Sequence, residues 1–228
     1  MKKVSPYSLS GLSICFDLDG TLVDTAPDLV RVTSEVIAKR GHGPVDYRKA
    51  RSAVGYGSRR MLTDALEAVD DRASDEEIDL MQTEFLDRYA KSIDTLSRPF
   101  AGVEETLVTL IKLGAELSVC TNKPGWLARP LLEKLKLDRY FIRIVGGDEP
   151  KQKKPAAGHI FETAGHRDSA QIVMVGDAWP DMRAAHNANV YSILMRYGYT
   201  PIPQIRLRAG TRLSHFRDIV PTLCNRYG

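Results

Sequence analysis

Two aspartates, Asp17 and Asp19, directly follow the apolar segment Leu12–Phe16, which has the composition of a buried strand. Alternation along a strand would place both carboxylates on the same side. Like charges held side by side are unfavourable unless a cation or a shared proton offsets them. Magnesium does this with oxygen ligands, including backbone carbonyls. Gly20 permits a tight reversal of the chain after these acids. Ligands bind at the carboxyl ends of the strands in open α/β sheets, so we expect a Mg²⁺ site at this end of the strand.

Three later segments also place polar side chains after apolar runs or before predicted helices. Thr121 and Asn122 can donate hydrogen bonds to an anionic group, and the next helix adds its N-terminal amides. Lys153 and Lys154, before a predicted helix, supply cations. Asp177 and Asp181 add two carboxylates. Taken singly, each segment also fits a structural role: a helix cap, a solvated loop or an acid in a first helical turn.

The apolar runs alternate with amphipathic segments, which predicts a doubly wound parallel sheet with right-handed crossovers. Continuous apolar runs bounded by polar residues are typical of central parallel strands. The expected strands are 12–16, 115–120, 142–145, 171–175 and 190–195. The expected helices between them are 103–112, 126–135, 157–164 and 180–187. Such a Rossmann-like α/β core would gather the polar side chains at one edge of the sheet.

Residues 25–97 interrupt that alternation, because they contain no convincing strand. Ser74 and Glu77 form a possible capping box for a helix that follows. We therefore expect an inserted all-helical cap domain at 25–97 and a catalytic core made of 1–24 and 98–228. The helices expected in the cap are 26–40, 47–54, 58–69 and 75–93.

The string DLDGTLVD at residues 17–24 resembles the first motif of the phosphatase branch of the haloacid dehalogenase superfamily. The segments with Thr121, Lys154 and Asp177 follow in the order of that family's other motifs. The resemblance covers nearly the whole chain, and the inserted helices match the family's helical cap. One departure is Ala178-Trp179, because members commonly carry serine or threonine directly after the last motif's aspartate. A bulky Trp179 would line or narrow the substrate site.

The resemblance implies a magnesium-dependent phosphomonoester hydrolase that forms an aspartyl-phosphate. Asp17 would be the nucleophile. Asp19 would protonate the leaving alkoxide and then take a proton from the attacking water. Thr121 and Lys154 would hold the phosphoryl oxygens. The resemblance implies three ligands of Mg²⁺: the Asp17 side chain, the Asp19 backbone carbonyl and Asp177. Asp181 would lie behind these ligands and orient them.

A finer resemblance concerns the substrate. Segments 23–29, 55–57 and 196–199 are similar to the phosphoglycolate phosphatase subgroup, which implies 2-phosphoglycolate or a similar small phosphorylated metabolite as substrate. Gly20 and Asn122 are further expected substrate contacts. Arg59 is a candidate to bind a substrate carboxylate bidentately, although a surface arginine at a helix start fits the sequence equally well.

Rival functions share much of this pattern. A β-phosphoglucomutase-like phosphosugar mutase has the same nucleophile and acid/base pair, and sugar phosphatases and pyrophosphatases have nearly the same motifs. A protein that only senses phosphate, on a phosphatase fold that has lost its activity, is disfavoured. The charged residues Asp17, Asp19, Lys154 and Asp177 are all present. Haloacid dehalogenase activity is disfavoured because those relatives generally lack an acid equivalent to Asp19.

The composition of the 228 residues disfavours several other classes of protein. A formal charge of +3 without a dense basic stripe argues against nucleic-acid binding. No stretch approaches the roughly 20 apolar residues of a membrane span, and the N-terminus is a poor secretory signal. Three scattered cysteines argue against a disulfide framework. We therefore expect a cytoplasmic enzyme, a monomer or homodimer, that binds a small metabolite and neither nucleic acid nor membrane.

Overall fold

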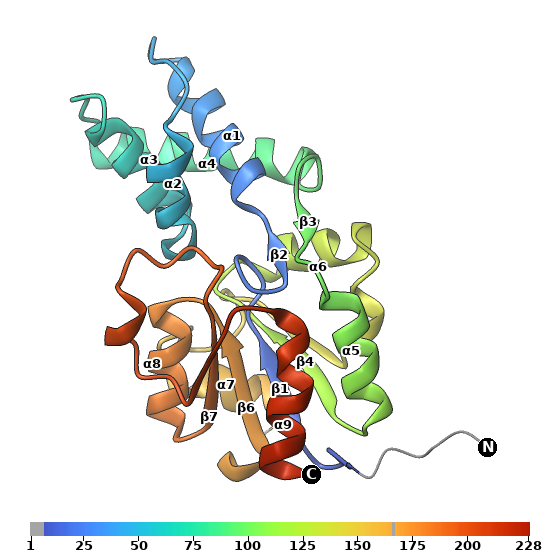
Figure 1. Ribbon diagram of the computed structural model, residues 1–228. Coiled ribbons are helices and arrows are strands. Elements are labelled where there is room, and N and C mark those ends of the chain that lie inside the picture. Colours follow the sequence, from blue (N-terminus) through green and yellow to red (C-terminus); the bar gives the residue numbers. More distant parts are fainter. Residues whose placement is uncertain (1–6, 166) are drawn as a thin grey trace.

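The computed structural model describes residues 7–165 and 167–228, and its core is a six-stranded parallel sheet (Figure 1). The strands run in the order β5-β4-β1-β6-β7-β8. Their bounds are β1 Ser13–Phe16, β4 Glu116–Cys120, β5 Arg143–Val145, β6 Ile172–Gly176, β7 Tyr191–Met195 and β8 Thr211–Leu213. The strand order changes direction at β1, as in doubly wound sheets. The expected Rossmann-like class is therefore confirmed.

The helices of the described chain divide between the core and the cap. Those of the core are α5 Val103–Lys112, α6 Gly125–Lys134, α7 Ala157–Ala164, α8 Trp179–Ala188 and α9 Ile219–Tyr227. Those of the cap are α1 Ala26–Ala38, α2 Tyr47–Ala50, α3 Ser58–Glu67 and α4 Asp75–Lys91, with a 3-10 segment, η1, at Arg51–Tyr56. The expected capping box of α4 is confirmed, since Ser74 and Glu77 each accept a hydrogen bond from the other's backbone N–H.

Different helices cover the two faces of the sheet. Ile14 and Phe16 of β1 belong to the large hydrophobic core that includes buried side chains of α5 and α9. Cys15, between them, packs instead with buried side chains of α7 and α8. This is the alternation of side chains along a strand. Since all three are 0% exposed, β1 is buried on both faces.

The cap helices lie together beyond one end of the sheet, and two adjacent chain crossings join them to the core (Figure 1). The crossings are β2 (Val23–Asp24) and β3 (Arg98–Pro99), a short antiparallel pair that the sequence did not predict. The single helix expected at 47–54 is divided into α2 and η1. Gly57, with a φ of 93°, ends η1 and begins α3. The domain boundaries at 24/25 and 97/98 remain a prediction.

The C-terminal segment belongs to the core. β8 pairs in parallel with β7. Phe216, Ile219 and Leu223 are 0% exposed. The sequence pattern did not predict β8, because its three residues form no apolar run.

None of the helices in residues 7–165 and 167–228 has both the length and the apolar character needed to cross a lipid bilayer.

Candidate active site

The loop after β1 brings its first aspartate to the carboxyl edge of the sheet. The Asp17 N–H donates to the Val175 carbonyl at 2.8 Å, so Asp17 continues the pairing of β1 with β6. The chain then reverses at Gly20, whose φ is 87°. A Cβ at Gly20 would lie 2.8 Å from the Asp177 Oδ2, and the Gly20 N–H donates to the Val23 carbonyl. Gly20 thus serves the turn and the close approach to Asp177. It is not among the residues that line the pocket, and its expected contact with substrate remains a prediction.

Three buried carboxylates meet where β1 and β6 end. Asp17, Asp177 and Asp181 each offer an oxygen, and these atoms lie within 4.8 Å of one another. Burial raises the pKa of Asp17 to about 7 and that of Asp177 well above its ordinary value. A cluster of this kind is costly to ionise unless a cation neutralises it. Buried oxygen donors at this separation fit a hard divalent cation.

Asp177 is held by two further contacts. Its Oδ1 accepts a hydrogen bond from the Thr21 hydroxyl at 3.0 Å, and its Oδ2 accepts one from the Tyr199 N–H at 2.7 Å. Hydrogen bonds of this kind fix the orientation of a carboxylate before a ligand binds.

Lys154 inserts its ammonium group between two of the acids. Its Nζ lies 2.8 Å from the Asp17 Oδ1 and 2.6 Å from the Asp181 Oδ1, and it donates to the Cys120 carbonyl at 2.5 Å. Burial opposes the charge on Lys154, but Asp17 and Asp181 outweigh it and raise the pKa of Lys154. These contacts favour the charged form of the Lys154 ammonium beside Asp17. The Asp181 Oδ2 accepts the Ala178 N–H at 3.0 Å, so Asp181 also holds the start of α8.

Thr121 and Asn122 follow β4 and line the same pocket. Thr121 is 1% exposed, and its hydroxyl accepts a hydrogen bond from the Lys123 N–H at 3.1 Å. The Asn122 amide nitrogen donates to the Lys154 carbonyl at 3.0 Å. This bond joins the loop after β4 to the loop that carries Lys154. The structure thus gathers Asp17, Asp19, Thr121, Lys154, Asp177 and Asp181 into one pocket.

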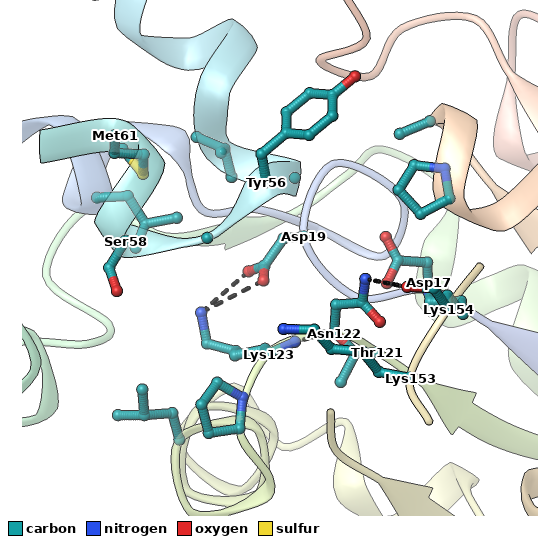
Figure 2. A pocket seen from close by; sticks show the side chains of 18 of the residues that line it. Asp17, Asp19, Tyr56, Ser58, Met61, Thr121, Asn122, Lys123, Lys153 and Lys154 are labelled. Atoms are coloured by element: carbon teal, nitrogen blue, oxygen red, sulfur yellow. Dashed lines mark hydrogen bonds and ion pairs between the residues drawn. The ribbon is translucent and has the colours of Figure 1, made fainter. Parts of the chain in front are cut away.

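Sequence reasoning assigned no role to Lys123, although it directly follows Asn122. Its Nζ lies 3.1 and 3.4 Å from the two carboxylate oxygens of Asp19. Dashed lines in Figure 2 mark these two contacts. The same nitrogen donates to the Tyr89 hydroxyl at 2.8 Å. Burial would lower the pKa of Lys123, but Asp19 and Tyr89 outweigh burial and raise it. Lys123 is therefore a buried ammonium that joins the loop after β4 to α4 of the cap.

A cavity of about 260 Å³ lies between the cap and the edge of the sheet. From the cap, η1 and the start of α3 contribute Tyr56, Ser58 and Met61 (Figure 2). From the core, Trp179 lies at the margin and is 40% exposed. Cavities of this size suit small metabolites.

Arg59 is not among the residues that line this cavity, so its expected contact with substrate remains a prediction. Its guanidinium pairs with Asp75 at 2.6 Å and with Asp79. These partners belong to α4, on the exposed side of the cap. The adjacent Ser58 faces the cavity instead, because neighbouring residues of a helix point in different directions.

Comparison with known proteins agrees with this geometry. The sequence model of haloacid dehalogenase-like hydrolases matches residues 14–195, from β1 to the end of β7. This chain belongs to that family. Among curated relatives, the phosphoglycolate phosphatase of Agrobacterium fabrum is 43% identical over 218 residues, which cover 94% of this chain and 93% of that protein. The phosphoglycolate phosphatase of Caulobacter vibrioides is 37% identical, covering 96% and 92%.

Solved structures of the haloacid dehalogenase family share the fold. The crystal structure of a predicted phosphoglycolate phosphatase from Haemophilus somnus 129PT matches with a TM-score of 0.87 and 27% identity, covering 94% of this chain and 98% of that one. The resemblance to the phosphatase branch is thereby confirmed, and this member of the family is a phosphatase.

Proposed function

We propose that this phosphatase hydrolyses 2-phosphoglycolate with Mg²⁺ as its metal. The main support is the pairing of two buried ammonium groups with different acids of one small cavity: Lys154 with Asp17, and Lys123 with Asp19. A phosphate ester that also carries a carboxylate presents two anionic groups, one for each lysine. The names of the two curated relatives point to the same substrate.

The chemistry follows from where the chain's own groups lie. An Asp17 oxygen attacks phosphorus, and the bond from phosphorus to the glycolate oxygen breaks. Asp19 gives its proton to that oxygen, then takes one from the water that cleaves the aspartyl-phosphate and releases phosphate. Thr121 and Lys154 hold the phosphoryl oxygens.

The acid cluster provides the proposed metal site. Mg²⁺, when bound by Asp17, Asp177 and the Asp19 carbonyl, supplies positive charge that offsets the approach of one anion to another. Asp181 orients Lys154 through its 2.6 Å contact.

Lys123 gives a physical reason for preferring a carboxylate. Before substrate binds, the Asp19 carboxylate balances the buried Lys123 charge at 3.1 Å. To act as an acid Asp19 must be protonated, and it then no longer balances that charge. A buried charge that loses its partner is strongly unfavourable. The substrate carboxylate restores the balance, whereas an ester with an uncharged alcohol does not.

A substrate panel tests the reaction. Purified protein with Mg²⁺ should release phosphate from 2-phosphoglycolate faster than from hexose and pentose phosphates, nucleotides or pyrophosphate. Asp17→Asn should reduce turnover by at least about 10³-fold with an unchanged circular dichroism spectrum, whereas Asp87→Asn, in an exposed pair of α4, should not. Unchanged activity of Asp17→Asn would exclude the mechanism. Isomerisation of a sugar phosphate that requires a bisphosphate activator would indicate the mutase alternative.

Lys123→Met tests the recognition of the carboxylate. The wild type should prefer 2-phosphoglycolate to ethyl phosphate, which shares its phosphate and methylene groups but has a methyl group in place of the carboxylate. We expect the ratio of their kcat/KM values to fall by roughly 100-fold in Lys123→Met, because one partner of a buried charge pair is lost. Lys153→Met, at the cavity margin, is the matched control. A ratio unchanged in Lys123→Met, or changed only in Lys153→Met, would rule out this role for Lys123.

We also propose a reducing, cytoplasmic location. The support is that Cys15, Cys120 and Cys224 are all buried free thiols. A monomer or a homodimer remains a prediction.

A further inference from the structure

The loop after β7, residues 197–199, contacts both the acid cluster and the attachment of the cap. On the core side, the Tyr199 N–H donates to the Asp177 Oδ2 at 2.7 Å. Gly198 lies so close to Asp177 that a Cβ there would be 2.1 Å from the Asp177 Cβ. A Cβ at Gly20 would meet the Asp177 Oδ2 and the Tyr199 ring, both at 2.8 Å. Asp177 and this loop are therefore packed as one unit.

The same tyrosine side chain holds the first crossing into the cap. The Tyr199 hydroxyl donates to the Asp24 Oδ1, in β2, and accepts a hydrogen bond from the Ala26 N–H at 3.2 Å. Ala26 is the first residue of α1. Tyr199 is 5% exposed, so its ring has little freedom to move independently of its backbone.

Two further contacts attach the loop to the cap and to the second crossing. Arg51, in η1 of the cap, donates to the carbonyls of Tyr197 and Gly198 at 3.3 and 3.4 Å, and its guanidinium lies 5.0 Å from the centre of the Tyr199 ring. The Tyr197 ring lies 4.4 Å from that of Phe100, directly after β3. Both crossings and η1 therefore meet one three-residue loop.

We propose that Tyr199 is a positioning residue that couples the orientation of Asp177 to the position of the cap. This inference rests on the proposed role of Asp177 as a ligand of Mg²⁺. When the metal fixes Asp177, the Tyr199 N–H keeps its partner, and the rigid ring presents its hydroxyl to Asp24 and Ala26. Conversely, a cap displaced at these residues pulls on the loop that supports Asp177. Such coupling is reciprocal: metal binding steadies the cap crossing, and loss of the crossing contact weakens metal binding.

Mg²⁺ binding and amide exchange test the coupling without substrate. In the wild type, Mg²⁺ should slow hydrogen exchange at the Ala26 amide, which donates to the Tyr199 hydroxyl. Tyr199→Phe removes that hydroxyl but keeps the ring and the N–H to Asp177. We expect its affinity for Mg²⁺, measured by calorimetry, to fall roughly fivefold or more, and the effect of Mg²⁺ on Ala26 exchange to disappear.

Two other variants make the result decisive. Tyr191→Phe also loses one hydroxyl contact, to Thr211 at 2.6 Å at the amino ends of β7 and β8, and should bind Mg²⁺ like the wild type. Arg51→Met acts from the cap without touching Asp177 and should weaken Mg²⁺ binding in the same direction as Tyr199→Phe. If Tyr199→Phe and Arg51→Met bind Mg²⁺ like the wild type, with Ala26 still responsive, the coupling is overturned. If Asp177→Asn also binds Mg²⁺ normally, the proposed metal site itself is wrong.

Discussion

Asp17 and Asp19 lie two residues apart, yet each has its own ammonium partner. Lys154 lies 2.8 Å from Asp17, and Lys123 lies 3.1 Å from Asp19. The proposed roles of the two aspartates also differ. The nucleophile must be ionised, whereas the proton donor must be able to hold a proton. Lys154 also contacts Asp181, and we expect it to keep this position during the reaction. Lys123 can exchange Asp19 for an anionic group of the substrate.

The acid cluster predicts how pH and Mg²⁺ act together. Burial raises the pKa of Asp17 from 3.8 to about 7, so the metal-free folded protein holds this proton more tightly than the unfolded chain does. The resulting stability is present below about pH 4 and is lost as the pH rises through about 7. Mg²⁺ competes with that proton, and its affinity should weaken by up to about tenfold per pH unit below pH 7.

Thermal unfolding with and without Mg²⁺ measures this competition. The rise in Tm caused by a fixed Mg²⁺ concentration should be larger at pH 7.5 than at pH 5.5. Asp177→Asn should lose most of the rise at both values, because it removes a proposed ligand. An equal rise at both pH values in the wild type would contradict proton competition.

At the scale of the elements, the buried carboxylate of Asp28 joins α1 to the end of the cap. Asp28, 0% exposed, accepts hydrogen bonds at 2.8 Å from the Leu96 N–H and from both the N–H and the hydroxyl of Ser97. Arg31 donates to its other oxygen at 3.0 Å. Burial opposes ionisation, but these donors outweigh it and lower the pKa of Asp28. The first cap helix is thereby fastened to the segment that enters β3.

Asp28→Ala should therefore destabilise the protein by about 3 kcal/mol, because several buried donors lose their acceptor. Urea unfolding at pH 7 measures the change. Ser74→Ala, which removes only the helix cap of α4, should cost about 1 kcal/mol. Since the pKa of Asp28 is lowered, its contribution should be full above the unfolded pKa and decline as the pH falls. If Asp28→Ala unfolds at the wild-type midpoint, the fastening is unimportant.

On the scale of the whole molecule, the cap and the core each place an aromatic ring at the cavity margin. Tyr56 of η1 is 45% exposed and Trp179 of α8 is 40% exposed, and both line the cavity of about 260 Å³. Tyr56 belongs to the cap and Trp179 to the core. The width of the entrance therefore depends on how the two parts are arranged.

Removing one ring should widen the range of substrates. Trp179→Ala should raise kcat/KM for a hexose phosphate, relative to 2-phosphoglycolate, by roughly tenfold. Trp126→Ala, which removes a 50% exposed tryptophan outside the cavity, is the control. Equal ratios in wild type and Trp179→Ala would show that Trp179 does not limit substrate size.

The sequence by itself determined the class of fold, the helical character of the insertion and most of the acid cluster. These features depend on local pattern: apolar runs make central strands, and polar residues directly after them meet at one edge of a parallel sheet. The spacing of Asp17 and Asp19 and the position of Asp177 after β6 could therefore be recognised without coordinates.

Only the tertiary structure decided which side chains from different elements meet. Tyr89 reaches Lys123 because α4 packs over the loop after β4, and nothing in the local sequence of α4 distinguishes Tyr89 from a core residue. Arg59 faces two acids of α4 because the direction in which a helix points each side chain depends on how the helix is packed. The contact of Tyr199 with Asp24 spans 175 positions in the chain. Spacing along the chain determines how residues close in sequence are arranged, whereas long-range packing determines which residues far apart in sequence come into contact.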